Sequence, residues 1–238
     1  MSGSASPPFD RAQWVVELRR ANEQQEDVLA PTYDAEWGDI EDTHRAFVER
    51  FLLVLGADGR VLDAACGTGK YFEMVLASGR SLVGVDHSSA YLSNARTKFP
   101  QVVTEKHDLQ DLPYRNEFDG VMCVDAMEFM PPEDWPLILA RFFHALRSEG
   151  WLYLTVEIVP EDEVRSGTEE ARRAGLPVVA GEVIWHEPDD YYHYYPDVTR
   201  VRAWVTDAGF AIVEDAEGPW QDGYAYHHIL ARAGVPTA

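Results

Sequence analysis

The fold is decided by the stretch Arg60-Val-Leu-Asp-Ala-Ala-Cys-Gly-Thr-Gly-Lys70. Its apolar pair Val-Leu predicts the end of a buried strand, and the small residues behind the aspartate predict a tight turn. Apolar side chains at Phe72, Val75 and Leu76 then recur at helical spacing. A strand, a small-residue turn and a helix are typical of the unit that opens a nucleotide-type site in a doubly wound α/β sheet.

Details of this turn separate three classes of ligand. A dinucleotide site has a third glycine three positions after the second, where this chain has Phe72. A phosphate-binding P-loop continues Gly-Lys with Ser or Thr, whereas Gly69-Lys70 is followed here by Tyr71. Asp63 is an acid that we expect to point into the crevice, where it suits a cationic amino-acid or sulfonium group and no phosphate. The turn therefore favours S-adenosylmethionine over NAD or a nucleoside triphosphate.

The stretch 61–69 resembles the first motif of the class I S-adenosylmethionine-dependent methyltransferases, of the type that acts on small molecules. The family often has Gly where this chain has Ala65, a change that should narrow the turn without blocking it. The resemblance covers most of residues 33–231 and implies a methyltransferase with S-adenosylmethionine as its cofactor. In this turn, the residues expected to contact the cofactor are Asp63, Ala64, Ala65, Cys66, Gly67 and Gly69.

The second strand, Ser81–Asp86, also ends in an acid. Such an acid can accept hydrogen bonds from both ribose hydroxyls. Asp86 lies 17 positions after Gly69, close to the ~20 expected of that acid. This spacing is shared by NAD and S-adenosylmethionine sites, so it supports the crevice and not the choice of cofactor. We expect Asp86→Ala to weaken cofactor binding and to leave folding little changed.

The third and fourth strands are expected at 102–108 and 118–125. By the resemblance, Asp108 reaches the adenine amino group and Leu109 flanks the ring. The carboxyl ends of parallel strands meet at one edge, where ligands bind. Further cofactor contacts are therefore expected from His87, Val124 and Asp125. The resemblance adds Tyr33, because a Tyr-Asp pair at this distance before the first motif often closes over the cofactor in that family.

The whole chain predicts one domain. Residues 1–8 read as a disordered leader, 9–238 as a single methyltransferase domain, and 9–55 as its N-terminal helical cap. Strands alternate with helices, which predicts a mostly parallel sheet wound on both faces. The last two strands, 210–213 and 224–231, have no helix between them, so they should pair as a hairpin and leave the final strand antiparallel. This arrangement is similar to the seven-stranded Rossmann-like sheet of the family.

Composition excludes several classes of protein. The formal net charge of −21 opposes nucleic-acid binding, which depends on neutralising phosphates with Lys and Arg. No apolar run approaches the length of a membrane span, so no membrane partner is expected. The N-terminus lacks the regions of a signal peptide, and two cysteines predict no disulfide framework, so we expect a cytoplasmic protein. No metal site is predicted.

The segment 157–197 lies between the fifth strand and the next helix, and the core does not need it. A turn at Pro188–Asp190 separates two aromatic, β-prone runs, which predicts a hairpin that acts as a substrate lid. Strand alternation should send Tyr191, His193 and Tyr195 to one side and the tyrosines between them to the other.

Candidate acceptor-site residues follow from the lid and the strand ends. The family often has Leu-Glu-His where this chain has Met127-Glu128-Phe129, so one familiar base is missing. The remaining candidate bases are Glu128, His193, His227 and His228, of which the adjacent histidines should face opposite sides of a strand. We favour His193 as the catalytic base because of its lid position. Substrate contacts are expected from Trp37, Glu128, Trp185, Tyr191, Tyr194 and His228.

The sequence thus predicts an enzyme that transfers a methyl group from S-adenosylmethionine to an oxygen or nitrogen of a small molecule. A tRNA-modifying methyltransferase is one alternative, because a similar Gly-Thr-Gly-Lys-Tyr run occurs there, but the net charge opposes it. A non-catalytic S-adenosylmethionine-binding regulatory domain is the other alternative. Such a domain has no need of an aromatic lid.

Overall fold

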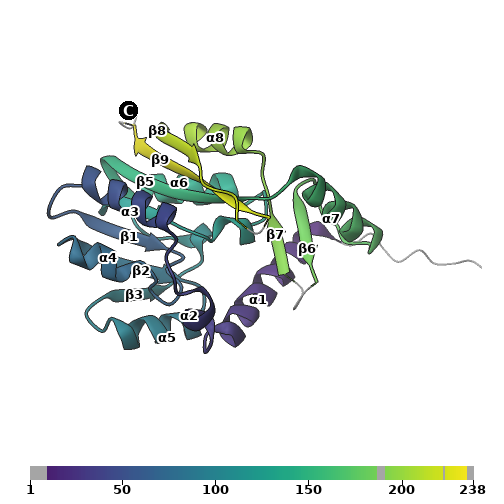
Figure 1. Ribbon diagram of the computed structural model, residues 1–238, viewed down its shortest axis with the longest axis horizontal. Helices are drawn as coiled ribbons and strands as arrows, with labels where there is room; N and C mark the ends of the chain where they lie inside the picture. The colour runs from purple at the N-terminus through teal and green to yellow at the C-terminus, as the bar shows by residue number, and fades with distance from the viewer. Residues whose placement is uncertain (1–9, 187–190, 222, 235–238) are drawn as a thin grey trace, which may run out of the picture.

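The computed structural model describes residues 10–186, 191–221 and 223–234, so the expected leader and the Pro188–Asp190 turn lie outside the described residues. The strands of the main sheet are β1 (Arg60–Ala64), β2 (Ser81–Asp86), β3 (Val103–Lys106), β4 (Phe118–Cys123), β5 (Leu146–Ile158), β8 (Phe210–Glu217) and β9 (Ala225–Ala233). Their order across the sheet is β3-β2-β1-β4-β5-β9-β8 (Figure 1). This order confirms the doubly wound sheet that the sequence predicts.

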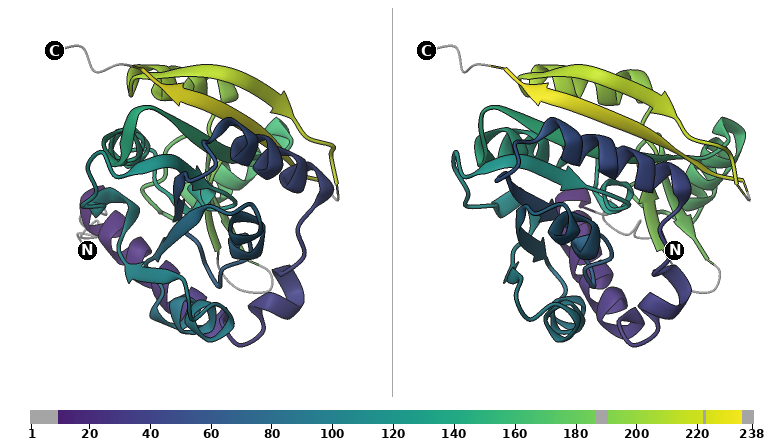
Figure 2. Two further views of the ribbon diagram at one scale, coloured as in Figure 1. Left: turned by 90° about the vertical axis from the view of Figure 1, so that its left-hand side faces the viewer. Right: turned by 60° about the vertical axis from the view of Figure 1, so that its left-hand side comes forward.

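Pairing in the sheet is parallel except at one end. β1 pairs in parallel with β2 and β4, and β4 pairs in parallel with β5. β9 runs antiparallel to both β5 and β8, which confirms the expected terminal hairpin. Figures 1 and 2 show this hairpin at one end of the sheet and β3 at the other.

Helices cover both faces of the sheet. Their bounds are α1 (Arg11–Leu29), α2 (Tyr33–Trp37), α3 (Asp42–Val54), α4 (Phe72–Ala77), α5 (Ser89–Lys98), α6 (Trp135–Ala145), α7 (Glu161–Arg173) and α8 (Val198–Asp207). One core holds buried side chains of α6 and α8, and the other holds those of α3, α4 and α5. Neighbouring residues Val61 and Leu62 of β1 enter opposite cores, because strand side chains alternate between faces.

The segment after β5 contains α7 and a separate two-stranded sheet of β6 (Glu182–Trp185) and β7 (Tyr191–Tyr194). The antiparallel pairing of β6 with β7 confirms the expected hairpin, whereas the sequence analysis missed α7. Glu182 fixes the hairpin to α1, because its carboxylate is fully buried and accepts hydrogen bonds from Arg11 and from the Tyr192 hydroxyl. Figure 1 shows the hairpin and α1 side by side, next to the sheet.

Candidate functional site

A cavity of about 730 Å³ lies at the carboxyl edge of the parallel strands. Its lining comes from α1, the segment 33–41, the loops after β1, β2, β3 and β4, and the β6–β7 hairpin. Ligand pockets commonly enclose ~300–1,000 Å³, so this cavity has the size of a ligand site. Its position is the one at which open α/β sheets bind ligands.

The turn after β1 forms part of the cavity wall. Ala65 has φ 64° and Gly67 has φ 53°, so both residues adopt the left-handed region. A Cβ added at Gly67 would meet nothing within 4 Å, so glycine is favoured there by the backbone angle. Gly69, with φ 86°, differs, since a Cβ there would lie 2.8 Å from the Phe72 ring. Phe72, at the position of the absent third glycine, therefore fills the space behind the turn.

Asp86 links the turn after β1 to the turn after β2. One carboxylate oxygen accepts from the Gly67 N–H at 2.8 Å, and the other accepts from the Ser88 N–H at 2.8 Å. The side chain is buried and lines the cavity. Because two backbone donors depend on this carboxylate, the structure predicts that Asp86→Ala reduces stability, whereas the sequence predicts little change.

Asp63 lies beneath the turn and does not line the cavity. It is 1% exposed, and its Oδ2 atom has no hydrogen-bond partner among the described residues. Burial, together with the nearby Asp86 carboxylate, raises the pKa of Asp63 to about 8. A buried, unpartnered carboxyl beside the first turn fits a cationic ligand group, or a water that the ligand orders.

His87 and Glu26 join α1 to the loop after β2 through an ion pair. Burial by itself lowers the pKa of His87, but the bond to Glu26 and the surrounding carboxylates raise it to about 9. Burial raises the pKa of Glu26. Potential metal-ligand atoms of Glu26, Asp86 and His87 lie within 4.8 Å of one another, the one such group among the described residues. A protonated imidazole cannot coordinate a metal, so the ion pair is sufficient to explain this group.

Asp125 follows β4 with φ 53° and is held from three elements. Its side chain lies 2.8 Å from His44 Nε2 and 3.7 Å from Lys70 Nζ, and its N–H donates to the Thr155 hydroxyl. Burial raises the pKa of Asp125, but the hydrogen bond and charge of His44, together with Lys70, bring it below its usual value. The sequence analysis missed His44. Its spacing with Phe47 and Phe51 on one helical face could have identified it as a buried polar residue.

The far side of the cavity carries Glu128, Glu157 and His193. Glu128 is 4% exposed, and its Oε2 atom has no partner among the described residues. Glu157 ends β5, and its Oε2 lies 3.9 Å from His193 Nε2. The sequence pattern marked Glu157 only as the start of the segment 157–197, although it is an acid near a strand end like Asp63 and Asp86.

Burial sets the protonation of these three groups. It raises the pKa of Glu128 well above its usual value, with Glu157 and Asp125 adding repulsion. It raises the pKa of Glu157 to about 7, with Asp125 adding repulsion. It lowers the pKa of His193 to about 4, so this imidazole is neutral near pH 7.

The structure brings together some of the expected acceptor-site residues and not others. Residues expected in the acceptor site that line the cavity are Trp37, Glu128, Trp185, Tyr191 and His193. Tyr194 does not line it, because strand alternation turns its ring towards Trp135 and Trp204 in the core. His228 does not line it either, because its ring stacks on Phe47 and bonds to the Tyr153 hydroxyl at 3.0 Å.

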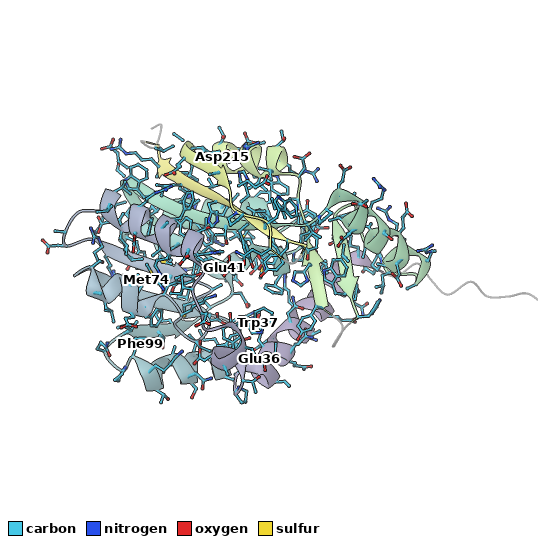
Figure 3. The ribbon with its side chains drawn as sticks, viewed as in Figure 1. Glu36, Trp37, Glu41, Met74, Phe99 and Asp215 are labelled. Carbon is cyan, nitrogen blue, oxygen red and sulfur yellow. The ribbon has the colours of Figure 1, made fainter. Side chains whose placement is uncertain are left out.

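The adjacent histidines of β9 face opposite sides, as expected, since His227 bonds to Asp215 on β8. Figure 3 labels Asp215 at the end of the molecule formed by β8 and β9. The same figure labels Glu36, Trp37 and Glu41, which line the cavity from α2 and the start of α3.

The expected cofactor residues also divide into two sets. Those that line the cavity are Tyr33, Ala65, Gly67, Asp86, His87, Asp108, Leu109 and Asp125. Those that do not line it are Asp63, Ala64, Cys66, Gly69 and Val124, all of which belong to strand ends or to the turn packed behind the wall. Contact of either set with a cofactor stays a prediction.

None of the helices in the described ranges combines the length and apolar character needed to cross a membrane.

Known proteins share this architecture. Residues 61–150 match a sequence family described as a methyltransferase domain. A trans-aconitate 2-methyltransferase from Sinorhizobium medicae is 26% identical, over 67% of this chain and 71% of the relative. A carboxy-S-adenosyl-L-methionine synthase from Wolinella succinogenes is 29% identical over 44% of this chain, and the match spans about half (47%) of that relative.

The fold agrees with these matches. A crystal structure of a SAM-dependent methyltransferase from Methanosarcina mazei superposes with a TM-score of 0.71 at 16% identity, covering 83% of this chain and 99% of that one. The matched residues contain the turn after β1, and the seven-stranded sheet with an antiparallel last strand is the arrangement expected from the resemblance. The matched segment and the fold therefore agree with a class I S-adenosylmethionine-dependent methyltransferase that uses S-adenosylmethionine as its cofactor.

Proposed function

We propose that this chain transfers the methyl group of S-adenosylmethionine to an oxygen or nitrogen of a small molecule held in the cavity. The observation that carries the proposal is the continuity of the cavity, which runs from the strand-end loops to an aromatic wall built by residues 157–197. One part suits the cofactor and the other suits an acceptor, so one enclosed space can hold both reactants.

The residues of the turns would hold the cofactor. Ala65, Gly67 and Asp86 line the wall there, and Asp86 keeps room for ribose hydroxyls on carboxylate oxygens that already accept backbone N–H groups. The unpartnered Oδ2 of Asp63 lies behind this wall, where a water ordered by the cofactor would satisfy it. When bound, S-adenosylmethionine supplies a methyl group activated by its sulfonium. The task of the chain is then to align the acceptor and exclude water, and alignment alone can be worth roughly 7–11 kcal/mol.

The charge of the cavity supports a small acceptor over tRNA. Among the described residues, nine acidic side chains line the cavity, against Arg19, Lys70 and His87, whose raised pKa keeps it protonated near pH 7. A polyanion entering this space would meet repulsion on most sides. The aromatic wall supports catalysis over simple cofactor binding, because a binding domain has no use for an aromatic wall beyond the cofactor residues. The relative named trans-aconitate 2-methyltransferase is also named for a small molecule.

The test has a binding and a transfer step. Calorimetry should detect binding of S-adenosylhomocysteine and none of NAD. With S-adenosylmethionine labelled in its methyl group, label should enter small molecules from a metabolite library and not tRNA. Label in tRNA would contradict the proposal. Tight S-adenosylhomocysteine binding without transfer to any small molecule would instead support a regulatory binding domain.

A further inference from the structure

The acceptor side of the cavity holds two acidic side chains whose ionised forms have no arginine or lysine as counter-charge among the described residues. Glu128, from the loop after β4, and Glu157, at the end of β5, both line the cavity. Within the described part of the chain, neither forms an ion pair with an arginine or a lysine. The neighbouring His193 is 3.9 Å from Glu157, beyond hydrogen-bond distance. An ionised carboxylate in such a place lacks a counter-charge.

Glu128 is the strongest indication that the acceptor side of the cavity binds a ligand. The residue is 4% exposed, and its Oε2 atom has no hydrogen-bond partner among the described residues. Leaving a buried polar group unsatisfied costs about 1–3 kcal/mol, and more when the group is charged. Such groups persist where function needs them, so a donor that arrives with the acceptor would satisfy this oxygen.

Aromatic rings surround the same carboxylates. Phe129 and Tyr195 flank His193, with ring centroids 4.9 and 5.6 Å from the imidazole. Trp185 packs edge-on against Tyr195 and donates a hydrogen bond to its hydroxyl at 2.9 Å. The faces of aromatic rings attract cations, and the attraction is stronger where water is excluded. Carboxylates within an aromatic wall therefore form a chamber suited to a cation.

The chamber suits an organic cation better than a metal ion. A metal needs several ligand atoms that converge on one point. Within the described residues, the group of three acidic or histidine ligands close enough together is Glu26, Asp86 and His87, which does not include Glu128 or Glu157. An ammonium instead donates hydrogen bonds to two separated carboxylates while its carbon body packs on the rings.

We propose that the acceptor is an amine, bound as an ammonium between Glu128 and Glu157, and that the methyl group goes to its nitrogen. This proposal rests on the proposed function and names its substrate class. Glu157 accepts one proton from the ammonium, which frees the nitrogen lone pair. That lone pair forms the N–C bond while the S–C bond breaks and its electron pair stays on sulfur. The charges balance, because the amine gains the positive charge that the sulfonium loses.

His193 then serves as a wall of the chamber and not as the base. Its pKa of about 4 makes it a weak proton acceptor near pH 7, whereas the pKa of Glu157, about 7, suits proton transfer there. The charged groups that face Glu157 are Glu128 from the loop after β4, Asp125 from the end of β4 and His193 from β7.

The experiment uses protein saturated with S-adenosylhomocysteine and three probes of similar shape. These are 2-phenylethylamine, 2-phenylethanol and 3-phenylpropionate, which differ in charge. Calorimetry should show the amine binding about tenfold or more tightly than the alcohol, and the carboxylate binding least. Measurements in buffers of different ionisation enthalpy should show protons released on amine binding at pH 7, because the cation lowers the raised pKa values of Glu128 and Glu157.

Isosteric variants assign the effect to residues. Glu128→Gln and Glu157→Gln should each remove most of the preference for the amine over the alcohol and leave S-adenosylhomocysteine affinity unchanged. Glu163→Gln, an exposed carboxylate on the same cavity, is the matched control and should keep the preference. With S-adenosylmethionine and a panel of primary and secondary aryl-alkyl amines, the product should carry the methyl group on nitrogen.

Three results would overturn the proposal. Equal binding of the three probes to the wild-type protein would show that the chamber does not select a cation, and this result needs no variant to fold. Loss of S-adenosylhomocysteine affinity in Glu157→Gln would assign that carboxylate to the cofactor. Methylation at oxygen, or of no amine, would exclude nitrogen as the acceptor. Failure of S-adenosylhomocysteine to bind at all would instead contradict the proposed function.

Discussion

Two buried carboxylates, Asp86 and Glu128, line the same cavity but differ in their hydrogen-bond partners. Asp86 is buried with both oxygens accepting backbone N–H groups, so its place is complete without a ligand. Glu128 is equally buried, but its Oε2 has no partner among the described residues. Among the described residues of the cofactor side, Asp63 Oδ2 is the buried carboxylate oxygen without a hydrogen-bond partner, and Asp86 is fully paired. On the acceptor side, buried polar atoms of Glu128 and His193 have no partner among the described residues.

The difference separates residues that stabilise the fold from residues that reduce its stability for function. A carboxylate that caps backbone donors stabilises two turns at once. A buried carboxylate without a partner destabilises the folded state, and the destabilisation is relieved when a complementary ligand binds. Substitutions on the two sides should therefore change the free energy of unfolding in opposite directions.

The largest combined effect, on stability and on cofactor affinity together, is expected on the cofactor side. Asp86→Ala removes the acceptor of the Gly67 and Ser88 N–H groups, so the free energy of unfolding should fall by about 2 kcal/mol or more. Cofactor affinity should fall too, by about 1.5–3 kcal/mol, if the carboxylate also holds the ribose. Denaturant unfolding and S-adenosylhomocysteine calorimetry measure the two losses. Asp86→Asn, which keeps one acceptor oxygen, is the control and should lose less stability. Unchanged stability in the alanine variant would mean that the hydrogen bonds of Asp86 do not stabilise the two turns.

Glu157→Gln should show the opposite sign. The folded-state pKa of Glu157 is about 7, above its ordinary 4.5, so the wild-type protein should lose stability as pH rises between these values. The raised pKa corresponds to a loss of about 3 kcal/mol, complete above pH 7. The glutamine variant should therefore be more stable than the wild type at pH 8 and equal to it near pH 4.

Thermal or denaturant unfolding across this pH range tests the prediction. Glu163→Gln, at an exposed position, should follow the wild-type curve. A Glu157→Gln variant that is less stable than the wild type at pH 8 would mean that the carboxylate has a stabilising partner, and the contrast between the two sides would fail.

His193→Ala should have a smaller effect, confined to turnover. Loss of the ring that lies between Phe129 and Tyr195 should loosen the acceptor and lower turnover about tenfold, which corresponds to about 1.4 kcal/mol in the barrier. S-adenosylhomocysteine affinity should not change. Because the pKa of His193 is about 4, His193→Gln should restore most of the rate. If both variants are equally slow, His193 transfers a proton and the base has been misassigned to Glu157.

The smallest effect concerns the turn after β1. Ala65 has φ 64°, and the left-handed region costs an L-residue with a Cβ roughly 1–2 kcal/mol. Ala65→Gly should therefore raise the free energy of unfolding by up to about 1 kcal/mol, after the greater entropy loss of glycine. Gly67→Ala should lower it by about 1–2 kcal/mol, since φ is 53° and the added Cβ meets no atom. If both substitutions shift the free energy of unfolding by the same amount and in the same direction, the left-handed backbone angles do not explain the residues of this turn.

Local patterns predicted most of the fold. The alternation of strands and helices, the acid that ends β2 and the absence of a helix between the last two strands predicted the sheet and its antiparallel end. Helix α7 was missed because its residues are mostly charged, so few apolar side chains mark its buried face. The strand-end turns could be assigned because their chemistry lies in consecutive residues.

What the sequence by itself determined is therefore the cofactor class, through the turn at 63–72, and the position of the crevice, through the acid at 86. Only the tertiary structure decided the acceptor side. Glu128, Glu157 and His193 come from β4's loop, β5 and β7, so neither their proximity nor their burial is encoded in local spacing. Burial in turn sets their protonation, because removing a charge from water shifts a pKa according to everything packed around it. The same folding turned Tyr194 and His228 into core residues, although their side chains suit a binding site equally well.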